Sequence, residues 1–304
     1  MTLSCPTLEV EVWSLGATLV GVTAKSAGAS VPLVARLADL AEYDDPARNH
    51  FVGCTMGRWC RMITDGQFEI DGNRYDLRRD RRGRHAHGGP AGFHAQRWDL
   101  RVDDSRPSSR AAVFTLASPD GHQGYPGAVE AQVEYRLSDD GVLTVDYRGV
   151  TSAPTLFGLA NHVYWRVDDE PIDAHELLLP AGRRLEIVDD VPSPDSPVPV
   201  AGTESDFRTR RVLGTQAVDA YFVLDGPSRA CELAVPHRGI ALTLSTTASG
   251  VGVYTGDHDP VARRGICLEF GGWPGAERRA DFPSPVLRPG EVYEEGWELR
   301  VTGR

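Results

Sequence analysis

Residues 129–147, VEAQVEYRLSDDGVLTVDY, contain two runs of alternating apolar and polar residues on either side of a short turn. An alternation with a period of two places every second side chain on the same face of a β-strand. Asp140 and Gly141 lie between the runs, and glycine accepts the positive φ that tight hairpin turns require. The stretch therefore predicts an antiparallel β-hairpin.

Similar runs recur along the chain, separated by clusters of Gly, Pro, Asp and Ser. We expect further strands at residues 8–13, 112–116, 176–179, 220–224, 240–245 and 265–270. The 32 glycines and 21 prolines among 304 residues are an excess typical of a chain that turns often. The best helix candidate is the short segment 34–43, and the proline-rich segment 191–200 is interpreted as a loop. The sequence predicts an all-β fold, one large antiparallel sandwich or barrel over residues 1–304.

Composition excludes several classes of protein. The net charge of −11 and the pI of about 5.3 disfavour a nucleic-acid partner, because an acidic surface repels phosphates. No apolar run approaches the roughly 18 residues that a membrane-spanning helix needs, so we expect no membrane association. Residues 1–29 lack the pattern of a signal peptide. The five cysteines are scattered without a CxxC pair, which indicates reduced thiols in a cytoplasmic protein.

Three titratable residues lie in apolar segments. His162 is in GLANHVYW (158–165), where partial burial and titration near neutrality would suit a general acid or base. The alternative is a core histidine hydrogen-bonded to a backbone carbonyl. Glu269 ends an apolar run, and Asp219 lies in VDAYF. Each carboxylate either faces solvent, which the local pattern favours, or sits in a cleft where burial raises its pKa.

Two further clusters have a functional and a simpler interpretation. His85, His87 and His94 resemble part of a metal site, but no carboxylate follows at a useful spacing and glycines after His87 mark a turn, so we expect no metal. The basic run RRDRRGR (78–84) either receives an anionic substrate or is a solvated loop, and we favour the loop. No phosphate-cradling or dinucleotide-binding glycine motif is present in a suitable setting, so we expect no cofactor.

Taken in order, many short segments resemble those of the aldose 1-epimerase (galactose mutarotase) family. The resemblance covers roughly residues 9–300 and includes MGRW (56–59), ITDGQF (63–68), DGNRYDL (71–77), HGGPAGF (87–93), Trp98, SPDG (118–121), GYPG (124–127), NHVY (161–164), VDAYF (218–222), VYTG (253–256), LE (268–269) and LRPGEVY (287–293). Each segment is weak evidence alone, but the ordered set is specific.

The resemblance implies a large β-sandwich that binds a sugar in an open cleft and interconverts its α and β anomers without a metal or cofactor. In that family role Glu269 removes the proton of the anomeric hydroxyl, and His162 protonates the ring oxygen. His87 and Asp219 orient substrate hydroxyls, and Tyr254 is a candidate cleft wall. The implied partner is a small carbohydrate or related cyclic hemiacetal, and the protein is expected to be a monomer or a homodimer.

Three positions depart from the family pattern. An Asn-Arg pair usually stands where this chain has Arg61 and Met62, and a Gln often stands where it has Gly271. Either the substrate is not free galactose or glucose, or Arg61 replaces the missing arginine from the neighbouring position as a substrate-binding residue. The second explanation needs a local bulge, because adjacent strand residues face opposite sides. The alternatives to a mutarotase are an enzyme for a modified or phosphorylated sugar or a non-sugar lactol, and a non-catalytic carbohydrate-binding protein.

Overall fold

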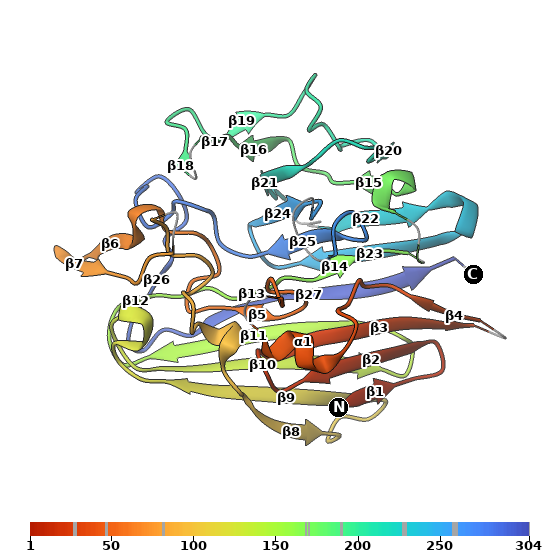
Figure 1. Ribbon diagram of the computed structural model, residues 1–304, viewed down its shortest axis with the longest axis horizontal. Helices are drawn as coiled ribbons and strands as arrows, with labels where there is room; N and C mark the ends of the chain where they lie inside the picture. Colours follow the sequence, from red (N-terminus) through yellow and green to blue (C-terminus); the bar gives the residue numbers. More distant parts are fainter. Residues whose placement is uncertain are drawn as a thin grey trace.

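A computed structural model describes residues 1–26, 29–45, 48–80, 83–167, 169, 171–188, 191–226, 230–256 and 261–303. In these residues the chain is built of β-strands, with a single short α-helix, α1 (Leu40–Asp44). Five one-turn 3₁₀-helices join strands in the described part: η1 (Thr64–Gly66), η2 (Phe93–Ala95), η3 (His122–Gly124), η4 (Ile172–Ala174) and η5 (Pro236–Arg238). The all-β prediction is confirmed (Figure 1).

Three large antiparallel sheets make up the body of the molecule. The nine-stranded sheet has the order β20 (Arg211–Val212), β15 (Glu176–Leu178), β22 (Ala230–Val235), β23 (Ile240–Thr246), β27 (Tyr293–Thr302), β11 (Leu143–Thr151), β10 (Val129–Ser138), β9 (Ser109–Ser118) and β8 (Asp99–Asp103). The six-stranded sheet has the order β14 (Tyr164–Trp165), β25 (Ile266–Phe270), β24 (Gly250–Tyr254), β21 (Asp219–Val223), β16 (Arg183–Leu185) and β19 (Val198–Pro199). The four-stranded sheet is β1 (Thr2–Ser4), β2 (Leu8–Trp13), β3 (Thr18–Ser26) and β4 (Ala29–Pro32).

Four two-stranded pairs complete the described strands. They are β5 (Thr55–Met56) with β13 (Ala160–Asn161), β6 (Gln67–Ile70) with β7 (Asn73–Asp76), β12 (Thr155–Leu156) with β26 (Val286–Leu287), and β17 (Ile187–Val188) with β18 (Val191–Pro192). The proline-rich segment 191–200 thus supplies β18 and the edge strand β19, so it is more ordered than the loop that the sequence predicted.

The hairpin predicted from residues 129–147 is confirmed. Strands β10 and β11 pair antiparallel with Leu137 opposite Leu143, and Gly141 in the turn has a φ of 84°. That value lies in the left-handed region that glycine adopts without strain. The other predicted strands also form, with boundaries shifted by a few residues at most.

The predicted helix at 34–43 is wrong over most of its length. Only Leu40–Asp44 is helical, and Asp39 caps it by accepting a hydrogen bond from the backbone N–H of Glu42. The preceding residues are extended: Val34 forms a bridge with Trp165, and buried and exposed positions alternate from residue 35 to 37. Packing against the body of the protein therefore overrides the helical propensity of alanine and leucine.

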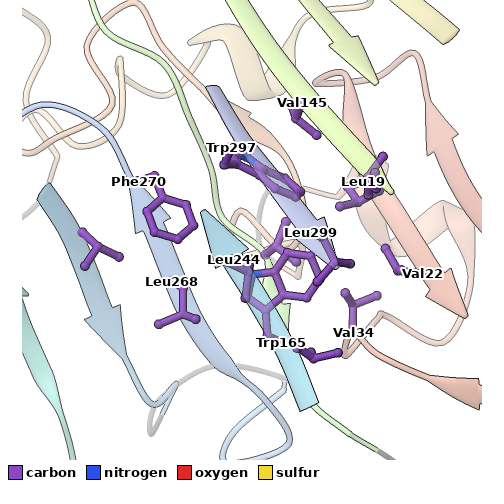
Figure 2. Close-up of a cluster of buried hydrophobic side chains, with 14 of the residues drawn as sticks. Leu19, Val22, Val34, Val145, Trp165, Leu244, Leu268, Phe270, Trp297 and Leu299 are labelled. Atoms are coloured by element: carbon purple, nitrogen blue, oxygen red, sulfur yellow. The ribbon is translucent and has the colours of Figure 1, made fainter. Parts of the chain in front are cut away.

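One continuous apolar core lies between the sheets and contains side chains from all three. Strand β25 contributes Leu268 and Phe270 to this core (Figure 2), and both are almost fully buried. Trp297 of β27 and Trp165 of β14 meet in the same core, with ring centroids 5.6 Å apart. Burying a large apolar side chain contributes about 1.5–3 kcal/mol. This packing fixes β25 in place, and with it the polar side chains on its other face.

Candidate active site

The candidate site lies on the face of the six-stranded sheet that is turned away from the core. In β25, Cys267 and Glu269 alternate with the core residues and so share that opposite face. On the neighbouring strand β24, Gly252 stands opposite Glu269, and Tyr254 stands opposite Cys267. Asp219 on β21 stands opposite Tyr254. Paired residues on adjacent antiparallel strands face the same way, so these five positions form one surface.

The carboxylate of Glu269 lies between two nitrogen-bearing side chains. Its Oε1 is 3.4 Å from His162 Nε2, and its Oε2 accepts a hydrogen bond of 2.9 Å from Arg61 Nη1. The three side chains are only 5–9% exposed. The structure therefore brings together the acid and the base that the sequence singled out, in a buried contact.

Backbone pairing holds His162 in position directly after β13. Its N–H donates to the carbonyl of Cys54, and its carbonyl accepts from the N–H of Gly53. The ring packs against Tyr164, with centroids 5.1 Å apart. The alternative of a core histidine bonded to a backbone carbonyl is not what is observed, because the ring nitrogens face Glu269 and Cys267.

Opposing influences act on the pKa of Glu269. Burial raises it, but the electrostatic influence of His162, Arg61 and His87 and a hydrogen bond from Cys267 together outweigh burial, so the pKa is lowered from its ordinary value. Glu269 is therefore ionised at neutral pH and available as a proton acceptor. This is opposite to the raised pKa that the sequence suggested for a carboxylate in a cleft.

Cys267 partners the other ring nitrogen of His162. Its Sγ lies 3.4 Å from His162 Nδ1. A thiol is both a weak donor and a weak acceptor, so it can partner Nδ1 in either charge state of the ring. The Nε2 atom of the ring faces Glu269. Sequence reasoning missed this contact, although Cys267 and Glu269 are two residues apart on one strand and so share a face.

His87 lies beside the pair, with its ring 5.7 Å from that of His162. Its Nδ1 is 2.7 Å from the backbone carbonyl of Cys60, so Nδ1 carries a proton and Nε2 is an acceptor. Burial lowers the pKa of His87 to about 4, which keeps the ring neutral at physiological pH. A neutral acceptor of this kind suits contact with a hydroxyl group.

Phe51 connects three histidines and was not identified from the sequence. Its ring centroid is 4.8 Å from that of His87, 4.7 Å from that of His94 and 6.1 Å from that of His162. These residues are separated by up to 111 positions in the chain, and no local pattern in the sequence relates them.

The histidine cluster considered as a metal site does not form one in the described residues. There, the group of three or more His, Cys, Asp and Glu side chains whose ligand atoms all lie within 4.8 Å of one another is His162, Cys267 and Glu269. His85 is buried elsewhere, with Nδ1 2.7 Å from the carbonyl of Arg78. Because Arg61 brings a positive charge to the same carboxylate, we do not interpret this group as a metal site.

Arg61 reaches Glu269 from a segment that is not a strand. Residues 60–62 lie between two isolated bridges, from Trp59 to Gly158 and from Ile63 to His85. Because residues 60–62 are not part of a strand, their side chains need not alternate between two faces. The guanidinium of Arg61 can therefore face Glu269. The position of Arg61 therefore agrees with the local irregularity that the sequence analysis required.

Arg58 fixes the same segment from its other end. Its buried guanidinium donates to Ser118 Oγ and to the carbonyls of Pro119, Pro126 and Gly127. It therefore binds together the SPDG and GYPG turns. We assign it a structural role.

The remaining candidates lie at the edge of the site or away from it. Asp219 is exposed at the start of β21, and Tyr254 is partly buried against Tyr164, with centroids 6.4 Å apart. In the basic run, Arg78 and Arg79 are exposed and Arg84 pairs with Asp80, as expected of a solvated loop. Two members of that run, at positions 81 and 82, lie outside the described residues.

Comparisons with known proteins give consistent matches. The model of the aldose 1-epimerase family matches residues 1–300. Aldose 1-epimerase of Escherichia coli K12 is 30% identical over 280 residues, covering 83% of this chain and 79% of that protein. Galactose mutarotase of Homo sapiens is 31% identical over 312 residues, covering 94% and 89%.

Solved structures show the same fold. Galactose 1-epimerase from Lactobacillus acidophilus matches with a TM-score of 0.89 at 24% identity, covering 99% of this chain and 93% of that one. An aldose epimerase homologue from C. elegans matches with a TM-score of 0.90 at 21% identity, covering 100% and 98%. In the described part of this chain, no helix has the length and apolar character needed to cross a membrane.

Proposed function

The chain belongs to the aldose 1-epimerase family of isomerases, and from this we propose that it interconverts the α and β anomers of a sugar, with Glu269 as base and His162 as acid. The buried contact of 3.4 Å between Glu269 Oε1 and His162 Nε2 is the observation that carries the proposal. The family membership alone does not assign roles to residues of this chain.

The short distance suits the chemistry. Exchange of anomers requires a proton to leave the anomeric hydroxyl and another to reach the ring oxygen. Both oxygens are bonded to the anomeric carbon, so their base and acid must lie within a few ångströms of each other. A carboxylate and an imidazole in direct contact meet this requirement after a small separation to admit the substrate.

The proposed steps conserve protons and electrons. Ionised Glu269 takes the proton of the anomeric hydroxyl, while the imidazolium form of His162 gives its Nε2 proton to the ring oxygen. The bond between the anomeric carbon and the ring oxygen breaks, which leaves an open-chain aldehyde. His162 keeps its Nδ1 proton, which faces the sulfur of Cys267. The aldehyde rotates about its bond to the next carbon, and closure with the roles reversed yields the other anomer.

Three other residues are proposed to hold the substrate. Neutral His87 lies beside the pair and offers an acceptor nitrogen to a hydroxyl. Asp219 and Tyr254 share the face of the sheet that carries Glu269, and we assign them to a hydroxyl contact and to a wall of the cleft. These assignments rest on position and on side-chain chemistry.

A specialised substrate is the second candidate, and a specific observation favours it. Met62 and Gly271 provide no polar side chain at two positions where the family pattern has Arg and Gln. A hydrogen bond to a charged partner contributes about 1.5–3 kcal/mol, so the loss of such contacts weakens binding of an ordinary hexose. Turnover of glucose or galactose with a sub-millimolar KM would exclude this candidate.

The setting of the reaction is also a proposal. The scattered, buried cysteines support a cytoplasmic location, and the net charge of −11 supports the absence of a nucleic-acid partner. We propose that the protein acts as a monomer or a homodimer on a small carbohydrate or related hemiacetal, without a metal or cofactor.

Polarimetry of freshly dissolved α-glucose and α-galactose tests the proposal. The wild-type protein is expected to accelerate the decay of optical rotation, and Glu269→Gln, which keeps the shape of the side chain but cannot accept the proton, is expected to lose the acceleration. Half-buried Glu298→Gln, which pairs with Arg300, is the matched control and should behave as wild type. If wild type and Glu269→Gln give equal rates above background, the assignment of the base is wrong.

A further inference from the structure

The guanidinium of Arg61 is bound by the protein around the base. Besides the bond from Nη1 to Glu269 Oε2, Nη2 donates to the backbone carbonyl of Glu269 at 2.8 Å, and Nε donates to the carbonyl of Gly272 at 2.8 Å. Its Cζ atom lies over the ring of Tyr221, 4.9 Å from the ring centre. The hydroxyl of Tyr221 in turn donates to the carbonyl of Gly271. Arg61 thus contacts both the side chain and the backbone of Glu269.

Gly252 makes room for this arrangement, and Gly271 lies beside it. A Cβ atom at Gly252 would lie 3.2 Å from Arg61 Nη1, and one at Gly271 would lie 3.5 Å from Nη2 and 3.2 Å from the carbonyl oxygen of Leu159. The φ of Gly271 is 152°, a conformation that residues with side chains rarely adopt. The glycine at position 271 and the arginine at position 61 are therefore linked in space, although 210 residues separate them.

We propose that Arg61 is a positioning residue that holds the general base Glu269, and that Gly252 leaves the space that its guanidinium occupies. The inference rests on the proposed function of Glu269. It replaces the substrate-binding role that the sequence suggested for Arg61, because three of the N–H groups of this 5% exposed side chain already donate to the protein.

The two oxygens of the base then have separate tasks. Oε2 is held by Arg61, and Oε1, which faces His162, is the oxygen that receives the proton of the anomeric hydroxyl. Fixing one oxygen prevents rotation of the carboxylate and keeps the other in line with the acid. Arg61 acts through Glu269 and does not itself exchange a proton.

The pairing also sets the pH range in which the base works. Other titratable groups near Glu269 are His162, His87, Cys267, Cys54 and Cys60, and those near Arg61 include Tyr221 and Glu295. Loss of Arg61 removes one of the charges that oppose burial, so the pKa of Glu269 rises. A base with a raised pKa is protonated, and hence inactive, over more of the acid range.

Arg61→Met tests the inference through the pH dependence of kcat/KM. The acid limb of the variant's profile is expected to lie at higher pH than that of wild type, and below both pKa values each unit of this displacement is a tenfold loss of kcat/KM relative to wild type. Arg61→Lys keeps the charge but not the planar set of donors. It should retain the wild-type pH profile with a reduced kcat. Exposed Arg148→Met is the matched control and should leave both unchanged.

Gly252→Ala is a second variant that leaves Arg61 in the chain. Its Cβ crowds Nη1, so the profile is expected to move in the same direction as in Arg61→Met but by less. This variant keeps the inference testable if Arg61→Met does not fold. A wild-type pH profile in either Arg61→Met or Gly252→Ala would overturn the proposed role.

Carbon-13 NMR of protein labelled at the Glu carboxyl groups separates this inference from the proposed function. The Glu269 signal is the one missing from Glu269→Gln, and its midpoint should be below the ordinary Glu range in wild type and higher in Arg61→Met. If the midpoint does not move, Arg61 does not hold the base. If it moves but wild type has no anomerase activity, the positioning of Glu269 stands and the proposed function fails.

Discussion

At the scale of single residues, the chemistry of the site depends on the partner of each polar atom of Glu269 and His162. Glu269 has different partners on its two oxygens, and His162 has different partners on its two nitrogens. Each group is thereby left with one atom directed at the other, Oε1 and Nε2. Proton transfer needs this directionality, because an acid or base that rotates freely loses most of its advantage over water.

Cys267, the partner of His162 Nδ1, is the subject of the first prediction. Cys267→Ala removes a weak hydrogen bond that orients the ring, so kcat should fall by up to about tenfold, the equivalent of one neutral hydrogen bond of 0.5–1.5 kcal/mol. Cys267→Ser restores a donor and acceptor and should recover most of the loss. Steady-state polarimetry measures both variants, with Cys5→Ala as the control. A Cys267→Ala enzyme with unchanged kcat would contradict this role.

Residues 162 and 269 could be assigned as candidates from the sequence, but only with the help of the family resemblance. Local patterns favoured a core histidine and a solvent-facing carboxylate, since neither pattern reports on segments more than 100 residues away. The contacts of Phe51 and the hydrogen bond from Arg61 to Glu269 could not be predicted for the same reason. Arg61 could be singled out as unusual, but its role depends on backbone that is not part of a regular strand.

At the scale of elements, β25 divides its residues between the core and the site. The strand alternates strictly, so the packing of Leu268 and Phe270 determines the orientation of Glu269 between them. Strands were predictable in this protein because such alternation is local. The helix predicted at 34–43 is wrong over most of its length, because burial of Val34 and Leu37 against distant segments outweighs helical propensity over those few residues.

Leu268→Ala tests the supporting role of β25. The side chain is 2% exposed, and truncation of a buried leucine costs about 2–5 kcal/mol in the free energy of unfolding. Urea denaturation should show this loss, while anomerase activity below the unfolding transition stays within a few-fold of wild type. Leu100→Ala on the edge strand β8, where the side chain is 40% exposed, is the control and should change stability little. A loss below about 1 kcal/mol in Leu268→Ala would show that the core behind the site is not tightly packed.

At the scale of the whole molecule, strand order follows no simple rule in the sequence. The last strand, β27, lies between β23 and β11 in the nine-stranded sheet, and one core contains side chains from residue 3 to residue 299. Alternation predicts that a segment is a strand but not which strand it joins. The choice of a sandwich over a barrel therefore came from the resemblance. That the chain is one domain stays a prediction, which a single cooperative unfolding transition would support.

Buried histidines predict how stability depends on pH. Burial lowers the pKa of His94 to about 4, against 6.5 for an unfolded chain. The unfolded state therefore binds more protons between these values, and stability falls as the pH drops through this range. The contribution of His94 amounts to about 3 kcal/mol at most, at 1.36 kcal/mol per pKa unit.

Comparison of wild type with His94→Gln by urea denaturation from pH 7 to pH 4 measures this contribution. The variant cannot take up the proton, so its free energy of unfolding should decrease less over the range than that of wild type. Exposed His237→Gln is the control and should follow wild type. Equal decreases in wild type and His94→Gln would show that His94 is not held in its neutral form by the fold.

The central claim is that Glu269 and His162 act as one acid–base unit, and a double-mutant cycle tests it most directly. The measurement is kcat/KM for anomer interconversion in wild type, Glu269→Gln, His162→Asn and the double variant. Residues that act as a unit give losses that do not add, so each single variant should lose nearly as much as the double variant. If the loss in the double variant equals the product of two smaller independent losses, or if His162→Asn retains the wild-type rate, the two residues do not form the catalytic pair.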